Sequence, residues 1–179
     1  MNTSNIQLDI NTEETGWEEQ LPEAAGLIRS VLDKLAAHCP EGAVLTRFPR
    51  PELSILLTND ENIRILNRDY RGKDKATNVL SFPALSEEEI EGYFHAGSEL
   101  PDYPVSLGDI ILALETVKNE AISSNTSLEN HFCHLIVHGL LHLLGYDHMN
   151  DIEAEEMEGL EKTILGTLGI DDPYAEMST

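Results

Sequence analysis

Regular alternation of apolar and polar side chains marks the first extended segment of this chain. Ile6, Leu8 and Ile10 are apolar at every second position, which is the period of a strand with one buried face. Other short apolar runs end near residues that favour turns, such as the Pro-Arg-Pro segment 49–51 and Pro83. These patterns predict strands over residues 6–10, 44–48, 53–57, 79–82 and 106–113.

Apolar residues that recur every three or four positions predict helices between these strands and after them. Asp60, Ser127 and Asp151 favour the capping position before a helix, and Gly72 favours the position just after one. The expected helices run from about residue 18 or 22 to 38, and over 60–70, 114–123, 127–144 and 151–168.

The order of these elements predicts an α+β fold, with residues 1–179 forming a single domain. A mixed sheet of about four strands is expected to pack on several helices. The helix over 127–144 is apolar almost all round, so it should be central and buried. The glutamate-rich segment near 86–104 shows no clean period and is expected to be an acidic surface loop or a short amphipathic turn. The tail 171–179 is expected to fray.

Three histidines at the end of the central helix suggest a metal site. His138 and His142 are four residues apart, which places them on one helix face, about 6 Å apart along the axis. Gly145 can end the helix in a left-handed conformation, and the returning chain brings His148 toward the same point. We therefore predict one Zn²⁺ ion held by His138, His142 and His148, with water in the fourth tetrahedral position.

A structural zinc site is the main alternative once a metal is granted. Such a site usually has four protein ligands, often cysteines, but Cys39 and Cys133 are isolated in the sequence.

The expected location of the protein follows from its cysteines and its apolar segments. Lone cysteines are typical of a reducing compartment. The chain has no apolar run of the ~18 residues that a membrane span needs, and residues 1–15 lack the features of a signal peptide. We therefore expect a cytoplasmic protein without a membrane partner.

The charge of the chain counts against a nucleic-acid partner. Acidic residues number 33 against 11 Lys and Arg, which gives a formal net charge of −22. Nucleic-acid binders usually carry a basic surface, because neutralising phosphates supplies most of their non-specific affinity. Five of the eleven basic residues nevertheless fall in one short stretch; they are Arg64, Arg68, Arg71, Lys73 and Lys75. This basic strip is either a solvated, salt-bridged helix face or a local contact for RNA.

The histidine segment resembles two known families to different degrees. Its spacing is similar to the H-E-x-x-H-x-x-G-x-x-H pattern of metzincin proteases, but Gly139 stands where those enzymes have their general-base glutamate. The string HGLLHLLGYDH at 138–148 resembles much more closely the H-G-x-L-H-L-x-G-Y-D-H signature of the YbeY family. Residues 67–83 resemble that family's N-x-x-Y-R-x-K-D-x-x-T-[DN]-V-L-S-F-P pattern, and residues 107–110 resemble L-G-D-I.

This resemblance implies a bacterial, metal-dependent endoribonuclease that acts on single-stranded rRNA. In that family the activity serves 16S 3′ end maturation and ribosome quality control, so the ribosome or its proteins are expected partners. The resemblance also implies a catalytic role for Arg71, since family members need the matching arginine for activity. An arginine at a helix end beside a metal is suited to a phosphate, because its guanidinium is a planar, bidentate donor.

Two other functions stay open at this point. One is a ribosome-associated factor whose metal is mainly structural, which the acidic charge favours because ribosomal proteins are basic. The other is a different metal hydrolase, such as a peptidase. In the nuclease hypothesis the general base is unidentified. The metal-bound hydroxide itself, a carboxylate such as Asp109 or Asp147, and a route in which the ribose 2′-OH attacks all stay open.

Several further polar residues have alternative interpretations. We interpret Asp109, within a buried strand, as a structural hydrogen-bond acceptor rather than a site carboxylate. Asp147 is suited to orienting a ligand imidazole. His131 and His134 share the metal face but lie too far along the helix to join the other two, so they are expected to contact substrate or ligands, or to be ordinary core or surface residues.

Overall fold

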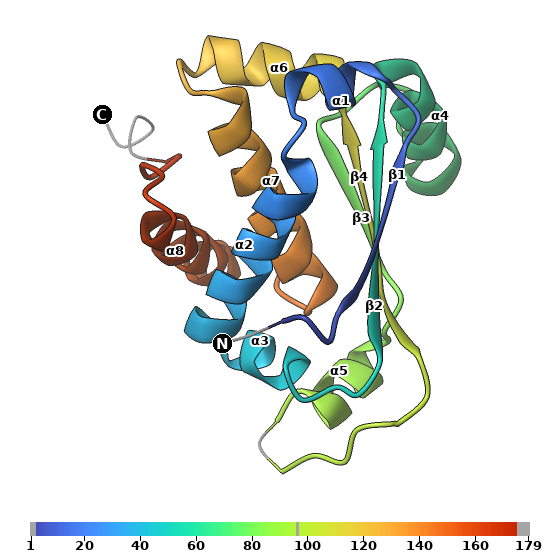
Figure 1. Ribbon diagram of the computed structural model, residues 1–179, viewed down its shortest axis with the longest axis vertical. Coiled ribbons are helices and arrows are strands. Elements are labelled where there is room, and N and C mark those ends of the chain that lie inside the picture. The colour runs from blue at the N-terminus through green and yellow to red at the C-terminus, as the bar shows by residue number, and fades with distance from the viewer. Residues whose placement is uncertain (1–2, 96, 175–179) are drawn as a thin grey trace.

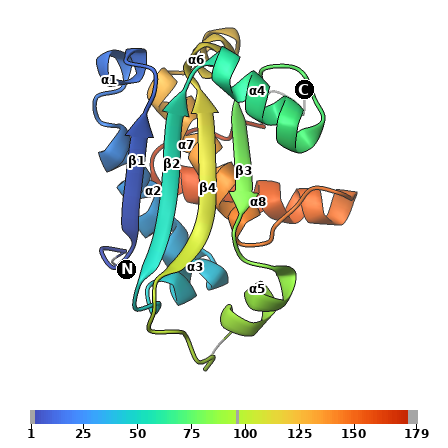
Figure 2. The same cartoon turned by 90° about the vertical axis from the view of Figure 1, so that its right-hand side faces the viewer.

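A four-stranded mixed sheet forms the centre of the computed structural model, which describes residues 3–95 and 97–174. Its strands are β1 (Gln7–Thr12), β2 (Pro51–Thr58), β3 (Val79–Pro83) and β4 (Val105–Ala113), and their order in the sheet is β1-β2-β4-β3 (Figure 2). β1, β2 and β4 run parallel, and β3 pairs antiparallel with β4. The predicted α+β class with a mixed sheet is confirmed.

Helices cover both faces of this sheet. They are α1 (Gly16–Gln20), α2 (Ala24–His38), α3 (Pro40–Leu45), α4 (Asp60–Arg71), α5 (Glu87–Tyr93), α6 (Leu114–Ser123), α7 (Leu128–Leu143) and α8 (Asp151–Thr167). α2, α7 and α8 lie on one side of the sheet and α4 on the other (Figure 1). The alternation of β4 explains this, because Ile110 and Leu112 belong to the large core, whereas Ile111 packs with Ile63 of α4.

α7 is the central helix that the sequence predicted. It contacts α2, α6 and α8 as well as β3 and β4, and most of its residues are buried. Gly139 allows the closest approach to the sheet. A Cβ atom at this position would lie 3.0 Å from the Ser81 Oγ and 3.1 Å from two side-chain carbons of Ile110. A glutamate at this position, where metzincin proteases have one, would therefore require Ser81 or Ile110 to shift.

The strand predicted over residues 44–48 is wrong. Residues 40–45 form α3, which begins with Pro40 in its first turn, where the missing N–H of proline costs nothing. Val44, Leu45 and Phe48 are all buried, and their spacing fits one face of a helical turn as well as a strand. So short an apolar run does not distinguish the two conformations.

The helix starts are also shifted from the predicted residues. The side chains of Asn59 and Asn150, not those of Asp60 and Asp151, cap α4 and α8, and each accepts a 2.9 Å bond from a backbone N–H in the first turn. Asp60 instead accepts a 2.7 Å hydrogen bond from the Thr116 hydroxyl. Asn-Asp pairs offer two good caps in succession, so the sequence alone leaves the choice open. Ser127 does cap α7, as predicted.

Three other segments differ from expectation. The helix predicted from residue 18 or 22 to 38 is divided into α1 and α2. Within 86–104, residues 87–93 form α5, which begins with a capping box of Ser86 and Glu89. Of the tail predicted to fray, residues 171–174 pack back onto α8 through Tyr174, whose hydroxyl donates to Glu161. Residue 96 of the loop and residues 175–179 of the tail lie outside the described residues.

Candidate metal centre

The turn after α7 brings the third histidine back toward the helix. Gly145 has a positive φ of 99°, a conformation that glycine adopts without steric cost. Its N–H donates to the carbonyl of His142 at 3.1 Å, and the N–H of Tyr146 donates to the carbonyl of Leu141 at 3.0 Å. These two bonds form the Schellman arrangement that ends many helices. The predicted reversal of chain direction at Gly145 is therefore confirmed.

The imidazoles of His138, His142 and His148 converge. Each offers one ring nitrogen, and these three nitrogens all lie within 4.8 Å of one another. The Nε2 atoms of His138 and His142 are 3.1 Å apart, a distance at which they share either a proton or a cation. Three imidazole nitrogens gathered on one point are a donor set that suits zinc.

The protonation of His142 favours metal binding. Burial lowers the pKa of His142 below its ordinary value, and the nearby His138 and His148 lower it further. The ring is therefore neutral at physiological pH, and neutral imidazole is the form that binds a metal.

A carboxylate that the sequence analysis missed holds the first of these rings. Glu161 of α8 has a side chain with 0% exposure, and its two oxygens contact the Nδ1 of His138 and the hydroxyl of Tyr174. Burial alone would raise the pKa of Glu161, but contacts with His134, His138 and Tyr174 outweigh it and lower the pKa to about 2. The ionised carboxylate accepts the Nδ1 proton of His138, which leaves the Nε2 lone pair facing the other rings.

One sequence signal could have identified Glu161. It follows Met157 by four residues and precedes Ile164 by three, so it stands within the apolar stripe by which α8 packs inward. An acidic residue at a core position needs a partner to be stable there.

Of the other candidate residues, Asp147 and His134 line the cleft beside the three histidines, whereas Asp109 and His131 do not. Asp147 is exposed; its carboxylate accepts from the backbone N–H of His148 at 2.7 Å but is 3.6 Å from the ring Nδ1, too far for a hydrogen bond. Asp109 is exposed on β4 and is not among the residues that line the cleft beside the histidines. His131 is 2.9 Å from Glu120, and His134 is 3.4 Å from the hydroxyl of Tyr174.

Arg71 and the three histidines line the same cleft, which has a volume of about 870 Å³. Arg71 is the last residue of α4, and its Nη2 donates to the carbonyl of Ser81 at 2.6 Å. Its guanidinium also lies 5.1 Å from the centre of the Phe82 ring. These contacts hold the side chain at the mouth of the cleft while using one of its five N–H groups in a hydrogen bond. Lys73 lines the same cleft.

The basic strip of the sequence is divided between two roles. Arg64 is paired with Asp74 at 2.6 Å, and Arg68 with Asp69 at 2.9 Å, both on the surface. These two arginines are the salt-bridged face that charged helical rows usually form. Arg71 and Lys73 face the cleft instead, so the positive charge near the histidines is local and small.

Comparison with known proteins gives a consistent result. Residues 9–169 match the family model described as Endoribonuclease YbeY. A protein of that name from Rhodospirillum rubrum is 48% identical over 96% of this chain and 82% of its own length. Another, from Azorhizobium caulinodans, is 47% identical over 95% of this chain and 97% of its own length.

The fold has a solved counterpart. The solution structure of TM1509 from Thermotoga maritima superposes with a TM-score of 0.53 at 22% identity, covering 96% of this chain and 92% of that one. At this identity the likeness concerns the fold alone. Within the part of the chain that the structure describes, no helix combines the length and apolar character needed to cross a membrane.

Proposed function

This chain belongs to the endoribonuclease YbeY family, and from that premise we propose that it is a zinc-dependent endoribonuclease that cuts single-stranded RNA. The observation that carries the proposal is the position of Arg71 in the same cleft as three converging imidazoles. A metal beside a guanidinium is suited to a phosphodiester, because both can stabilise the negative charge that builds on the phosphate.

His138, His142 and His148 are the proposed zinc ligands. When bound there, zinc supplies Lewis acidity, which lowers the pKa of water and stabilises developing negative charge. Glu161 keeps the Nδ1 proton on His138, so that the Nε2 of this residue is the ligating atom. Arg71 and Lys73, which line the same cleft, would bind the scissile phosphate.

The residue that activates the nucleophile stays open between two routes. Gly139 packs against Ser81 and Ile110, so the helix offers no carboxylate at the position that proteases use. Asp147 lines the cleft and is exposed, which allows it to accept a proton from water. The alternative is attack by the ribose 2′-OH. A 5′-phosphate on the product would indicate water, and a 2′,3′-cyclic phosphate would indicate the 2′-OH.

We further propose that the substrate is ribosomal RNA, in 16S 3′ end maturation and ribosome quality control in the cytoplasm. The net charge of −22 supports a protein-assisted encounter, since so acidic a chain gains little affinity from phosphates alone. Basic ribosomal proteins are complementary to it. Both described cysteines are free and buried, which suits a reducing compartment.

The acidic charge also favours a second candidate, a ribosome-associated factor whose metal is mainly structural. The two functions differ in one measurable property, which is the dependence of RNA cleavage on the metal. A peptidase of the metzincin kind is disfavoured, because Gly139 stands where those enzymes have their general-base glutamate and is packed closely against Ser81 and Ile110.

The experiment that tests the proposal combines metal analysis with single-turnover cleavage. The purified full chain is expected to carry one zinc per molecule and to cut a single-stranded fragment of the 16S 3′ precursor. Chelation should stop cleavage, and returning zinc should restore it. A zinc-loaded protein that binds ribosomes but leaves the RNA intact would favour the second candidate.

A further inference from the structure

A second cavity lies beside the metal cleft and shares a wall with it. Its volume is about 850 Å³. Asn78, His134, Leu135 and Tyr174 line both cavities. His131 lines only the second one, and it precedes His138 on α7 by seven residues, or about 10 Å along the helix. A strand of RNA crossing the metal cleft would therefore pass the opening of this cavity within one or two nucleotides of the metal.

The charge of the second cavity differs from that of the cleft. The cleft is lined by two cations, Arg71 and Lys73, and two acids, Glu87 and Asp147. The charged residues described around the second cavity are Glu120, Asp171 and Asp172, of which Asp172 pairs with Lys162 at 3.7 Å. No lysine or arginine lines this second cavity, so it offers less to a phosphate than the cleft does. A nucleobase carries no charge, so it suits this cavity better than the backbone does.

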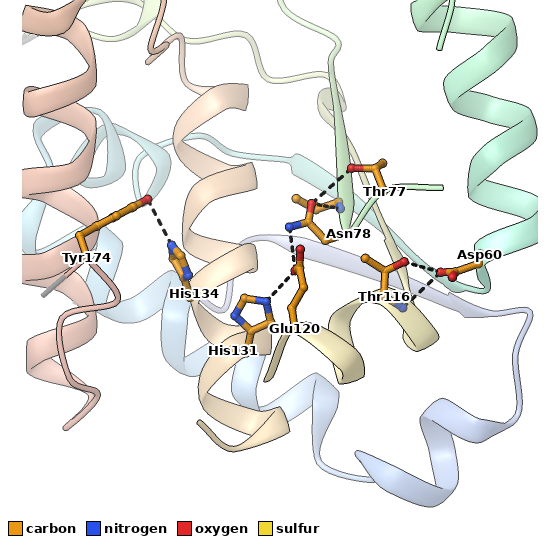
Figure 3. Close-up of polar contacts among 9 residues, drawn as sticks. Asp60, Thr77, Asn78, Thr116, Glu120, His131, His134 and Tyr174 are labelled. Carbon is orange, nitrogen blue, oxygen red and sulfur yellow. Dashed lines mark hydrogen bonds and ion pairs between the residues drawn. The ribbon is translucent and has the colours of Figure 1, made fainter. Parts of the chain in front are cut away.

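A hydrogen-bond network fixes the polar wall of this cavity (Figure 3). The Oε1 of Glu120 accepts a 2.9 Å bond from the Nδ2 of Asn78 and lies 2.9 Å from the Nε2 of His131. Asn78 is oriented in turn, because its Oδ1 accepts from the backbone N–H of Val79 at 2.6 Å. The Oε2 of Glu120 takes no part in these bonds, and the Glu120 side chain is 41% exposed.

The free Oε2 of Glu120 is an acceptor, so a ligand that fits must bring a donor for it. Exocyclic amino groups of adenine, cytosine and guanine are such donors, and carboxylates accept from them in nucleic-acid complexes. The rings of His134 and Tyr174, 5.6 Å apart and nearly perpendicular, form the wall between the two cavities. Unstacked RNA bases commonly lie against rings of this kind.

We propose that this second cavity binds one unstacked, amino-bearing base of the RNA strand whose scissile phosphate lies in the metal cleft. This inference rests on the proposed endoribonuclease function. Glu120 recognises the amino group, and Asn78 and His131 hold Glu120 in place. The cavity therefore selects the cleavage position, whereas the metal cleft performs the cleavage.

The test is a base scan on a short single-stranded RNA that the zinc-loaded protein cuts at one position. Each nucleotide within three of that position is replaced in turn by adenosine, by nebularine, which lacks the amino group of adenosine, and by an abasic ribonucleotide. Cleavage and equilibrium binding are both measured. At one position, removing the base is expected to lower kcat/KM and affinity about 10-fold or more. Removing only the amino group should account for much of that loss.

Variants then assign the effect to the cavity. Glu120→Gln keeps an oxygen for Asn78 and His131 but replaces the free acceptor by a donor, so it should erase the preference for adenosine over nebularine. Glu129→Gln is the matched control, because Glu129 is an exposed acid on the first turn of α7, outside the cavity. Zinc content and thermal unfolding of each variant establish that it is folded.

The outcomes separate this inference from the function on which it rests. A flat base scan on an RNA that is cut would overturn the cavity's role and leave the nuclease intact. A base effect that Glu120→Gln and Glu129→Gln change equally would also overturn it. Binding that depends on the base at one position without any cleavage would support the cavity while rejecting the nuclease.

Discussion

The two halves of α7 each carry two histidines, yet their surroundings differ. In the N-terminal half, His131 contacts Glu120 and His134 contacts Tyr174, so each ring has a protein partner of its own. In the C-terminal half, the Nε2 atoms of His138 and His142 face each other at 3.1 Å, with His148 beside them. The residue type and the helix are the same, and only the neighbours distinguish the two pairs.

This contrast shows that converging ring nitrogens indicate a metal site better than the mere presence of histidines on one helix face does. A nitrogen that already contacts a carboxylate or hydroxyl is satisfied, and it gains little from a cation. Nitrogens that converge on one another have lone pairs that repel, and a cation bound between them removes this repulsion. The carboxylate at His138 contacts the other nitrogen of that ring, Nδ1, so it strengthens the metal site instead of replacing it.

The largest expected effect comes from removing one histidine of each pair. We predict that His142→Ala abolishes zinc retention, because two imidazoles do not hold the ion against dialysis, whereas His131→Ala retains one zinc per chain. Metal analysis after dialysis against a weak chelator measures both. Equal zinc loss in the two variants would remove the distinction between the halves of the helix.

A substitution of Arg71 is expected to separate metal binding from cleavage at the C-terminal end of α7. Arg71→Glu should keep full zinc occupancy but lower single-turnover cleavage by about 10²–10³-fold, because a phosphate clamp becomes a repulsive charge. The control is Arg68→Glu on the same helix, where the native arginine forms a surface ion pair with Asp69. Cleavage by the Arg71 variant at the parental rate would contradict the phosphate-binding role.

Glu161 is the residue that would orient His138 as a ligand of the proposed zinc ion. We expect Glu161→Gln to weaken zinc affinity about 10–100-fold, since the amide is a poorer acceptor for the Nδ1 proton. Competition with a chromophoric zinc chelator gives the affinity. The matched control is Glu158→Gln, which neutralises an acid on the exposed side of the same helix. An affinity as high as that of the control would show that the contact is only structural.

The smallest expected effect concerns acid stability of the metal-free protein. The pKa of Glu161 is lowered to about 2 from its ordinary 4.5, so the unfolded state binds the proton more readily than the folded state. The stabilisation that Glu161 supplies is therefore complete above the ordinary value and is lost as pH falls toward 2. The difference in unfolding free energy between the parent and Glu161→Gln should shrink over this window in chemical denaturation. A difference that stays constant with pH would mean that Glu161 is not ionised in the folded protein.

Much of the fold and the histidine cluster could be predicted, because they depend on near neighbours in the chain. The four-residue spacing of His138 and His142, and the reversal at Gly145, follow from helix geometry and glycine conformation. The buried character of α7 follows from its composition. Predictions failed where two local conformations fitted equally well, as in α3, or where adjacent residues competed for one cap, as with Asn59 and Asp60.

By itself, the sequence determined that three imidazoles could meet at the end of one helix and that a glycine stands where a metzincin protease has its glutamate. Only the tertiary structure decided that Glu161, 23 residues away from His138, holds that ring, and that Asn78, Glu120 and His131 form a second polar wall. The physical reason is that covalent spacing fixes distances over a few turns of one helix. Contacts between α7, α6, α8 and β3 depend on how the whole core packs, which no local pattern specifies.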